Sequence, residues 1–100
     1  MTITKSGPNQ NNEYVISVTG EFDFNQVENF DDAYLDIPQG DHVIVVDFRK
    51  TEYMDSSGLG MLMKLRKHFG KDADIRLRTP NKQIINILEI ARFHEVFLIE

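Results

Sequence analysis

The chain has 100 residues, of which 41% are hydrophobic and 27% charged, a balance typical of one soluble globular domain. Cysteine is absent, which excludes disulfides, a thiolate nucleophile and zinc–thiolate sites. The net charge of −5 disfavours nucleic-acid binding, because the phosphates of a nucleic acid repel an acidic surface. The sequence has neither a secretory signal nor an apolar run that spans a membrane, so we expect a cytoplasmic protein that does not bind a membrane.

Charge is distributed unevenly along the chain. Residues 1–60 contain eleven acidic and three basic residues, whereas residues 61–100 contain five acidic and eight basic residues. Such asymmetry is one mark of a partner-binding surface. Two ordinary solvated faces also explain it, and composition alone favours that simpler explanation. Asp31 and Asp32, for example, fit the solvated side of a helix.

The hydrophobic pattern predicts strands that alternate with helices. The expected elements, in chain order, are strands at 3–5 and 14–19, a helix at 26–35, a strand at 42–48, a helix at 57–69, a strand at 74–78, a helix after Asn81 and a strand at 96–99. Gly20 is expected to end the second strand. The nearly continuous apolar run from His42 to Phe48 indicates a strand that is buried on both faces.

The element order β-β-α-β-α-β-α-β predicts an α/β fold in which helices flank a mixed sheet. No repeat, linker or low-complexity segment interrupts residues 1–100, so we expect a single domain over the whole chain. Nothing in the pattern requires more than a monomer.

The most informative segment is the junction of the buried strand with the long helix, Asp55-Ser56-Ser57-Gly58. Aspartate and serine are favoured at helix N-caps, because their side-chain oxygens accept hydrogen bonds from the free N–H groups of the first turn. Gly58 has no side chain, so we expect that another molecule approaches the backbone there. Gly60 lowers helix propensity one turn further on. Such local costs often coincide with a functional site.

The hydroxyl of Ser56 is better suited to accept a phosphate than to act as a nucleophile. A catalytic serine needs an adjacent base, and the three histidines lie in three different predicted elements. The nucleophile-elbow pattern is also missing, since Met54 replaces its first glycine. A phosphate at a helix start is tolerated by the helix dipole and by the free N–H groups. We therefore expect a protein that is not an enzyme and that needs no metal or cofactor. The competing interpretation is that this segment is only a helix cap and turn.

The segment Tyr53-Met54-Asp55-Ser56-Ser57-Gly58-Leu59-Gly60 resembles the signature of the STAS family, specifically that of the bacterial anti-sigma-factor antagonists. Gly20-Glu21-Phe22-Asp23 is similar to a second, weaker motif of that family. Its C-terminal helix and strand are similar to the pattern formed by Pro80, Ile84, Leu88, Phe93, Val96 and Phe97. The resemblance covers nearly the whole chain and implies a single STAS domain with a mixed sheet of four to five strands.

The resemblance also implies a function and a site. Ser56 falls on the serine that is phosphorylated in this family. An anti-sigma factor that is a serine kinase of the GHKL type would bind the unphosphorylated chain and release the phosphorylated one, and a phosphatase of the PP2C type would remove the phosphate. The expected partner contacts are made by Asp23, Asp55, Ser57, Gly58, Leu59 and Met63.

Two departures from the family concern other parts of the chain. Ala91-Arg92-Phe93 stands where the family often has a Thr/Ser-Gly-Leu turn, and the paired glycine after the signature helix is reduced to Gly70. Both bear on which partner is recognised. The alternative function is a constitutive STAS subunit of an ABC lipid-transport complex, which needs no phosphate switch. The final target, whether a sigma factor or a flagellar or biofilm regulator, is left open.

Overall fold

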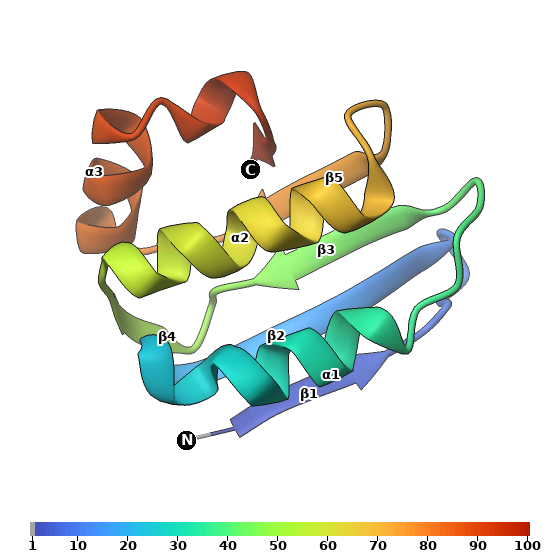
Figure 1. The fold of residues 1–100 in the computed structure, drawn as a ribbon, viewed down its shortest axis with the longest axis horizontal. Coiled ribbons are helices and arrows are strands. Elements are labelled where there is room, and N and C mark those ends of the chain that lie inside the picture. Colours follow the sequence, from blue (N-terminus) through green and yellow to red (C-terminus); the bar gives the residue numbers. More distant parts are fainter. Residues whose placement is uncertain (1) are drawn as a thin grey trace.

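A computed structural model describes residues 2–100, which form a mixed sheet with helices packed against it (Figure 1). The elements in chain order are β1 (Thr2–Ser6), β2 (Glu13–Phe22), the 3-10 helix η1 (Phe24–Gln26), α1 (Val27–Leu35), β3 (Val43–Asp47), β4 (Thr51–Met54), α2 (Ser56–Phe69), β5 (Asp74–Arg78), α3 (Lys82–Ile90), the 3-10 helix η2 (Phe93–Glu95) and β6 (Leu98–Ile99).

The sheet is organised around β2, which is ten residues long. The strand order is β1-β2-β3-β5-β6, and β4 pairs with β2 outside this path. Only β1 runs antiparallel to its neighbour, while the other pairs are parallel. The first half of β2 pairs with β3 and its end pairs with β4. The sheet therefore forks along β2, and β4 extends it toward the start of α2.

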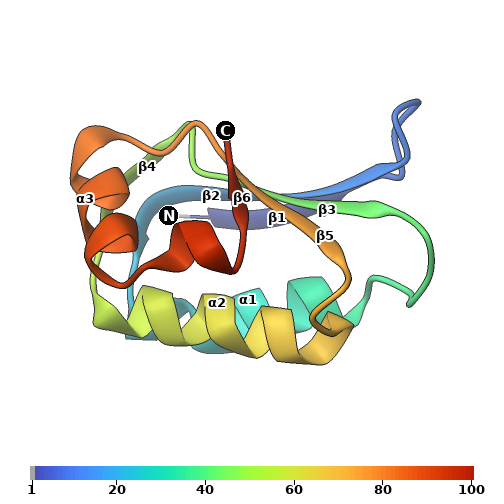
Figure 2. The same ribbon diagram turned by 90° about the horizontal axis from the view of Figure 1, so that it is seen from above.

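The core lies between the sheet and the pair of helices α1 and α2, which Figure 2 shows together on one face. Register places Ile16, Val46 and Leu77 in one row across three strands, and all three are buried. Leu62 and Leu65 of α2 are also fully buried in the same hydrophobic cluster. The amphipathic pattern of the sequence thus folds as expected, with the apolar stripe of each helix on the sheet.

On the opposite face of the sheet, an ion pair crosses the middle of β3. Val45 is 0% exposed although it points away from the main core. Glu13 and Arg78, from the strands on either side of β3, meet across that face with 2.8 Å between Oε2 and Nη2. By register, Val45 lies midway between them. The hydrogen bond from Arg78 lowers the pKa of the Glu13 carboxyl. The prediction of a strand buried on both faces is thereby confirmed, although β3 covers Val43–Asp47 and not the whole of residues 42–48.

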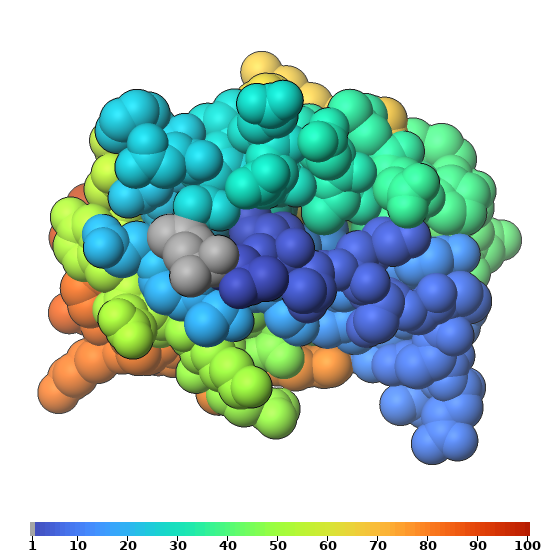
Figure 3. Space-filling view, turned by 90° about the horizontal axis from the view of Figure 1, so that it is seen from below, coloured from blue at the N-terminus to red at the C-terminus, as the bar shows by residue number. Residues whose placement is uncertain are grey.

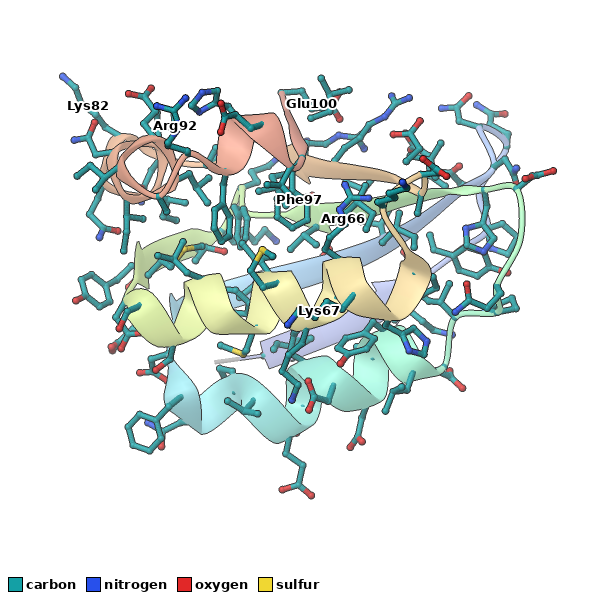
Figure 4. All side chains as sticks on the ribbon, turned by 45° about the horizontal axis from the view of Figure 1, so that its top comes forward. Arg66, Lys67, Lys82, Arg92, Phe97 and Glu100 are labelled. Atoms are coloured by element: carbon teal, nitrogen blue, oxygen red, sulfur yellow. The ribbon has the colours of Figure 1, made fainter. Side chains whose placement is uncertain are left out.

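Arg66 ties the end of α2 to the C-terminal segment. Its guanidinium donates hydrogen bonds to the carbonyl oxygens of Gly70, Ala73 and Val96. Figure 4 shows it pointing from α2 toward Phe97, whose ring centroid lies 5.0 Å from the guanidinium carbon. Arg66 forms no ion pair within residues 2–100, and burial lowers its pKa.

The expected α/β fold is confirmed, but the sheet has six strands instead of the four to five that the resemblance implied. Several element bounds also differ. Strand β4 lies in a stretch to which the sequence assigned no element, because four residues with a buried residue at each end show too little alternation to identify a strand. Gly20 does not end β2 but takes a φ of 92° beside a register shift, and the strand continues to Phe22. The predicted helix at 26–35 is preceded by η1. The last strand is reduced to Leu98–Ile99, because η2 precedes it.

Candidate functional site

The pairing of β2 with β4 brings two aspartates to the same edge of the sheet. Phe22 and Met54 are register partners in parallel strands, and Asp23 and Asp55 follow them directly. Asp23 accepts a hydrogen bond from the backbone N–H of Asn25 at 3.0 Å, and Asp55 accepts one from that of Ser57 at 2.9 Å. Each aspartate therefore caps the helix that follows its strand. The sequence predicted Asp23 and Asp55 as site residues, and the fold places them in adjacent turns.

Ser56 is the first residue of α2 and its side chain is exposed. Within residues 2–100 its hydroxyl makes no hydrogen bond, so a change at this oxygen breaks no internal contact. Ser57 is partly buried, and its backbone N–H donates a hydrogen bond to Asp55. Of the two serines, Ser56 is thus the more accessible to an enzyme that modifies it.

The two glycines in the first turn of α2 differ in their surroundings. A Cβ atom on Gly58 would lie 2.6 Å from Cγ of Met54, 2.9 Å from Cδ2 of Phe22 and 3.0 Å from the Phe22 carbonyl oxygen. Gly58 is buried, so the expectation that it admits a partner to the backbone is wrong: its missing side chain lets α2 pack on β2 and β4. A Cβ atom on Gly60 would meet nothing within 4 Å, and Gly60 is exposed.

Leu59 and Met63 lie on the flank of α2. Both are partly buried and pack against the core, whereas Met54 and Met61 are buried within it. Helical spacing places the exposed residues Ser56, Gly60, Lys64 and Lys67 along the outward ridge of α2. The partly exposed sides of Leu59 and Met63 therefore adjoin this ridge.

Two amide side chains at the start of α3, those of its N-cap Asn81 and of Gln83, bond to the open edge of β4, a feature that the sequence did not predict. The side-chain amide of Gln83 bonds both backbone groups of Met54: its Oε1 accepts from the N–H at 3.2 Å and its Nε2 donates to the carbonyl oxygen at 3.0 Å. Asn81 donates to the carbonyl oxygens of Thr51 and Glu52, at 3.2 Å each. Gln83 thus takes the place of a neighbouring strand just before Asp55 and Ser56. No sequence pattern indicates such a contact, because it depends on how α3 packs.

An ion pair joins α1 to α2 beside this site. Nζ of Lys64 lies 2.6 Å from Oδ2 of Asp31, so Asp31 is not the freely solvated residue that the sequence suggested. Asp32 is exposed, as expected. Within residues 2–100, no group of three or more side chains is suited to hold a metal ion. None of the helices in that range has both the length and the apolar character needed to cross a membrane.

Comparison with known proteins assigns the family. The family model described as "Mlab, STAS domain" matches residues 8–100. A STAS-domain containing protein of Pseudomonas aeruginosa (strain UCBPP-PA14) is 38% identical over 100 residues, which cover 99% of this chain and 99% of that protein. The chain belongs to the STAS domain family. This family is regulatory and non-enzymatic, which agrees with the prediction that the chain is not an enzyme.

Solved structures share the fold at low sequence identity. The anti-sigma factor antagonist SpoIIAA in its unphosphorylated form is 22% identical with a TM-score of 0.76, over 99% of this chain and 88% of that one. Its phosphorylated form from Bacillus is 18% identical with a TM-score of 0.68, over 99% and 91%. A sulfate transporter family protein from Wolinella succinogenes is 15% identical with a TM-score of 0.72, over 87% and 76%. These likenesses establish the fold.

Proposed function

We propose that this STAS domain is an anti-sigma-factor antagonist whose binding to a partner is controlled by phosphorylation of Ser56. The observation that carries the proposal is the state of the Ser56 side chain. It is exposed at the first position of α2, beside two capping aspartates, and its hydroxyl has no hydrogen-bond partner within residues 2–100. SpoIIAA, which shares the fold, is described in phosphorylated and unphosphorylated forms.

A phosphate at Ser56 would change the surface far more than the fold. It adds about −1.5 to −2 charges at neutral pH. The new charge stands next to the carboxylate of Asp55, which already caps the helix. A partner seated over Ser56 would have to desolvate this dianion, and a charge placed inside an interface costs several kcal/mol, roughly 2 to 5. A charge at the rim would change mainly the association rate. Ser56 is therefore assigned to the inside of the partner footprint.

The proposed partners are a serine kinase of the GHKL type that is also the anti-sigma factor, and a phosphatase of the PP2C type. The contact surface consists of Asp23, Asp55 and Ser57 around Ser56, with Leu59 and Met63 on the adjoining flank of α2. Gly58 is left out because it is buried. Alanine at Leu59 or Met63 is expected to weaken the complex more than alanine at Asp32, which is exposed on α1.

Affinity capture from cells of the native host tests the proposal, with the Ser56→Ala and Ser56→Asp variants as parallel baits. We expect the alanine variant to retain a GHKL-type kinase and the aspartate variant to lose it. The purified kinase with ATP should then phosphorylate the wild-type chain at Ser56 and leave Ser56→Ala unmodified, as read by mass spectrometry. Equal retention of the kinase by both baits would show that Ser56 does not control binding.

The second candidate is a constitutive subunit of an ABC lipid-transport complex. In that case Ser56 and Asp55 serve only to start α2. The same capture experiment separates the two functions. Recovery of an ABC ATPase on both baits would favour the constitutive subunit over the phosphorylation switch.

A further inference from the structure

Two large aromatic side chains are exposed at the end of the molecule that carries Ser56. Phe24 is 66% exposed and Tyr53 is 46% exposed. Tyr53 pairs with Glu21 and precedes Met54, whereas Phe24 follows Asp23. At the left of Figure 3, the segment around η1 (cyan) adjoins the junction of β4 with α2 (yellow-green).

Phe24 is the structural counterpart of Ser56. Phe22 and Met54 are register partners, the aspartates after them cap the next helix, and Phe24 and Ser56 are the first residues of those helices. The backbone angles of the two caps agree closely, with φ −129° and ψ −173° at Asp23 and φ −116° and ψ −171° at Asp55. Phe24 therefore has the same position after β2 that Ser56 has after β4.

Five carboxylates without a basic partner among the described residues lie in the segments that carry these two rings. Glu21, Asp23, Glu28, Glu52 and Asp55 belong to the ends of β2 and β4 and to the turns and first helical residues that follow. Within residues 2–100, none of the five forms an ion pair. Farther along α1, by contrast, Asp31 is paired with Lys64 and Asp36 with Lys5. In the part of the chain that the structure describes, two of the three acidic residues later in α1 and at its C-cap are paired and only Asp32 is not, whereas all five near Ser56 are unpaired.

From this arrangement we propose that Phe24 and Tyr53 anchor a partner whose contact surface offers an apolar pocket for Phe24 within a rim of basic residues. The inference rests on the proposed function, because it concerns the partner that docks over Ser56. Aromatic side chains seated in desolvated pockets supply much of the energy of protein interfaces. Five uncompensated carboxylates repel one another in the free domain, and a basic surface relieves that repulsion as it binds.

A basic partner is compatible with release on phosphorylation, because the carboxylates and the phosphate on Ser56 act at different places in the interface. The three exposed carboxylates, Glu21, Glu28 and Glu52, lie at the rim, stay solvated and attract the partner over a distance, which sets the association rate. Ser56 lies inside the footprint, where a kinase presents the phosphates of its nucleotide to the acceptor hydroxyl. After transfer, the phosphoserine faces the remaining nucleotide phosphates, and like charges repel at short range. Attraction at the rim therefore does not retain the phosphorylated chain.

Site-specific photocrosslinking tests the inference in host cells. A photoreactive phenylalanine analogue replaces Phe24 in the full chain, in the Ser56→Ala background that keeps the partner bound. Leu35, which is 57% exposed at the other end of α1, provides the matched control position. Mass spectrometry of the adduct identifies the partner surface. We expect an adduct specific to position 24 on a surface that combines apolar side chains with lysine or arginine. An adduct with an acidic or uncharged surface or with a second copy of this chain, or no adduct above the level at position 35, would overturn the inference.

The kinase or other protein identified in this way is then purified for binding measurements. Phe24→Ala is expected to weaken its binding roughly 10- to 100-fold and Leu35→Ala to leave it unchanged. Raising the salt concentration should slow association with the wild-type chain. If Phe24→Ala binds like wild type while Ser56→Asp does not bind, control of binding at Ser56 is supported and the proposed anchoring role of Phe24 is wrong. If Phe24→Ala loses binding while Ser56→Asp binds like Ser56→Ala, the anchor stands and the phosphorylation switch is wrong.

Discussion

Asp23 and Asp55 stand side by side and carry out the same structural task at the ends of two parallel strands. Each follows a member of the Phe22–Met54 register pair, and each accepts a hydrogen bond from the backbone N–H two residues ahead. Because one carboxylate oxygen suffices for the cap, the negative charge of each aspartate is available to another molecule. The structural and the proposed binding role of each residue are therefore separable by substitution.

Asparagine and alanine at position 55 separate these two roles. Asp55→Ala removes the cap and should lower the free energy of unfolding by about 1 kcal/mol, as measured by urea denaturation. Asp55→Asn keeps an oxygen that accepts from the Ser57 N–H, so it should remain close to wild type in stability. If the charge of Asp55 contacts the partner, both variants bind more weakly. If Asp55→Asn binds normally and only Asp55→Ala is impaired, the role of the residue is restricted to the cap.

The two glycines of α2 should respond to alanine in opposite directions. Gly58→Ala forces a Cβ atom against Met54 and Phe22 and should destabilise the domain by about 1 to 3 kcal/mol despite the higher helix propensity of alanine. Gly60→Ala meets no neighbouring atom and should stabilise it by about 1 kcal/mol. Thermal unfolding monitored by circular dichroism measures both changes.

The Gly60→Ala substitution is also expected to affect partner binding. Gly60 lies one turn after Ser56 on the outward ridge of α2, and no contact within the domain requires a glycine there. We expect Gly60→Ala to weaken the complex although it strengthens the fold, because the added methyl group holds the partner away from the helix. Unchanged binding would place Gly60 outside the contact surface.

Gln83 is expected to keep the end of β4 in place. Gln83→Met retains most of the side-chain volume but leaves both backbone groups of Met54 without a partner. A typical internal hydrogen bond contributes about 1 kcal/mol, so the variant should lose about 1 to 2 kcal/mol of stability. Hydrogen exchange measured by NMR should become faster at the Met54 amide than in wild type. Asn86→Met, an exposed substitution on the same helix, serves as the control. Equal exchange at Met54 in the two variants would contradict the role of Gln83.

The ion pair on the far face of the sheet predicts a pH dependence of stability. The pKa of the Glu13 carboxyl lies below its ordinary value of 4.5, chiefly because Arg78 donates a hydrogen bond to it. Its contribution to stability is therefore complete above about pH 4.5 and is lost as the pH falls through the lower pKa of the folded state. Glu13→Gln should cost about 1 to 2 kcal/mol at pH 7, and its difference from wild type should shrink in acid.

Urea denaturation over a series of pH values between neutral and acid measures this difference. Glu89→Gln provides the control, since Glu89 is exposed and forms no ion pair within residues 2–100. If the free energy of unfolding of wild type and of Glu13→Gln differed by the same amount at all pH values, the ion pair would contribute no pH-dependent stability.

Local chemistry made much of this fold predictable. The apolar run at Val43–Asp47 and the strict alternation at Asp74–Arg78 each indicate one structure, and both strands occur within or at the predicted bounds. The start of α2 was predicted one residue late, because Ser56 and Ser57 are both suitable at a helix start. Asp23 and Asp55 were predicted as site residues because each belongs to a sequence motif, although the sequence does not show that they are close in space.

The features that escaped prediction depend on contacts between distant segments. Strand β4 is defined by its pairing with the end of β2, and Gln83 acquires its role only when α3 packs beside that strand. The burial of Gly58 follows from the positions of Phe22 and Met54, which no local pattern reveals. Nothing in the sequence indicates the exposure of Phe24 either, because it depends on how the segment after β2 packs.

The forked pairing of β2 has a consequence for the kinetics of folding. β1 reaches β2 through a short hairpin, whereas β3 and β4 join it only after a helical connection and therefore close longer loops. Substitutions in the first half of β2, such as Ile16→Val, should slow folding, because this segment pairs with both β1 and β3. Substitutions at Phe22 or Met54 should mainly speed unfolding. The end of the molecule that carries Ser56 would then be the last part to form and the first to open, whereas the pairing of β1, β2 and β3 persists.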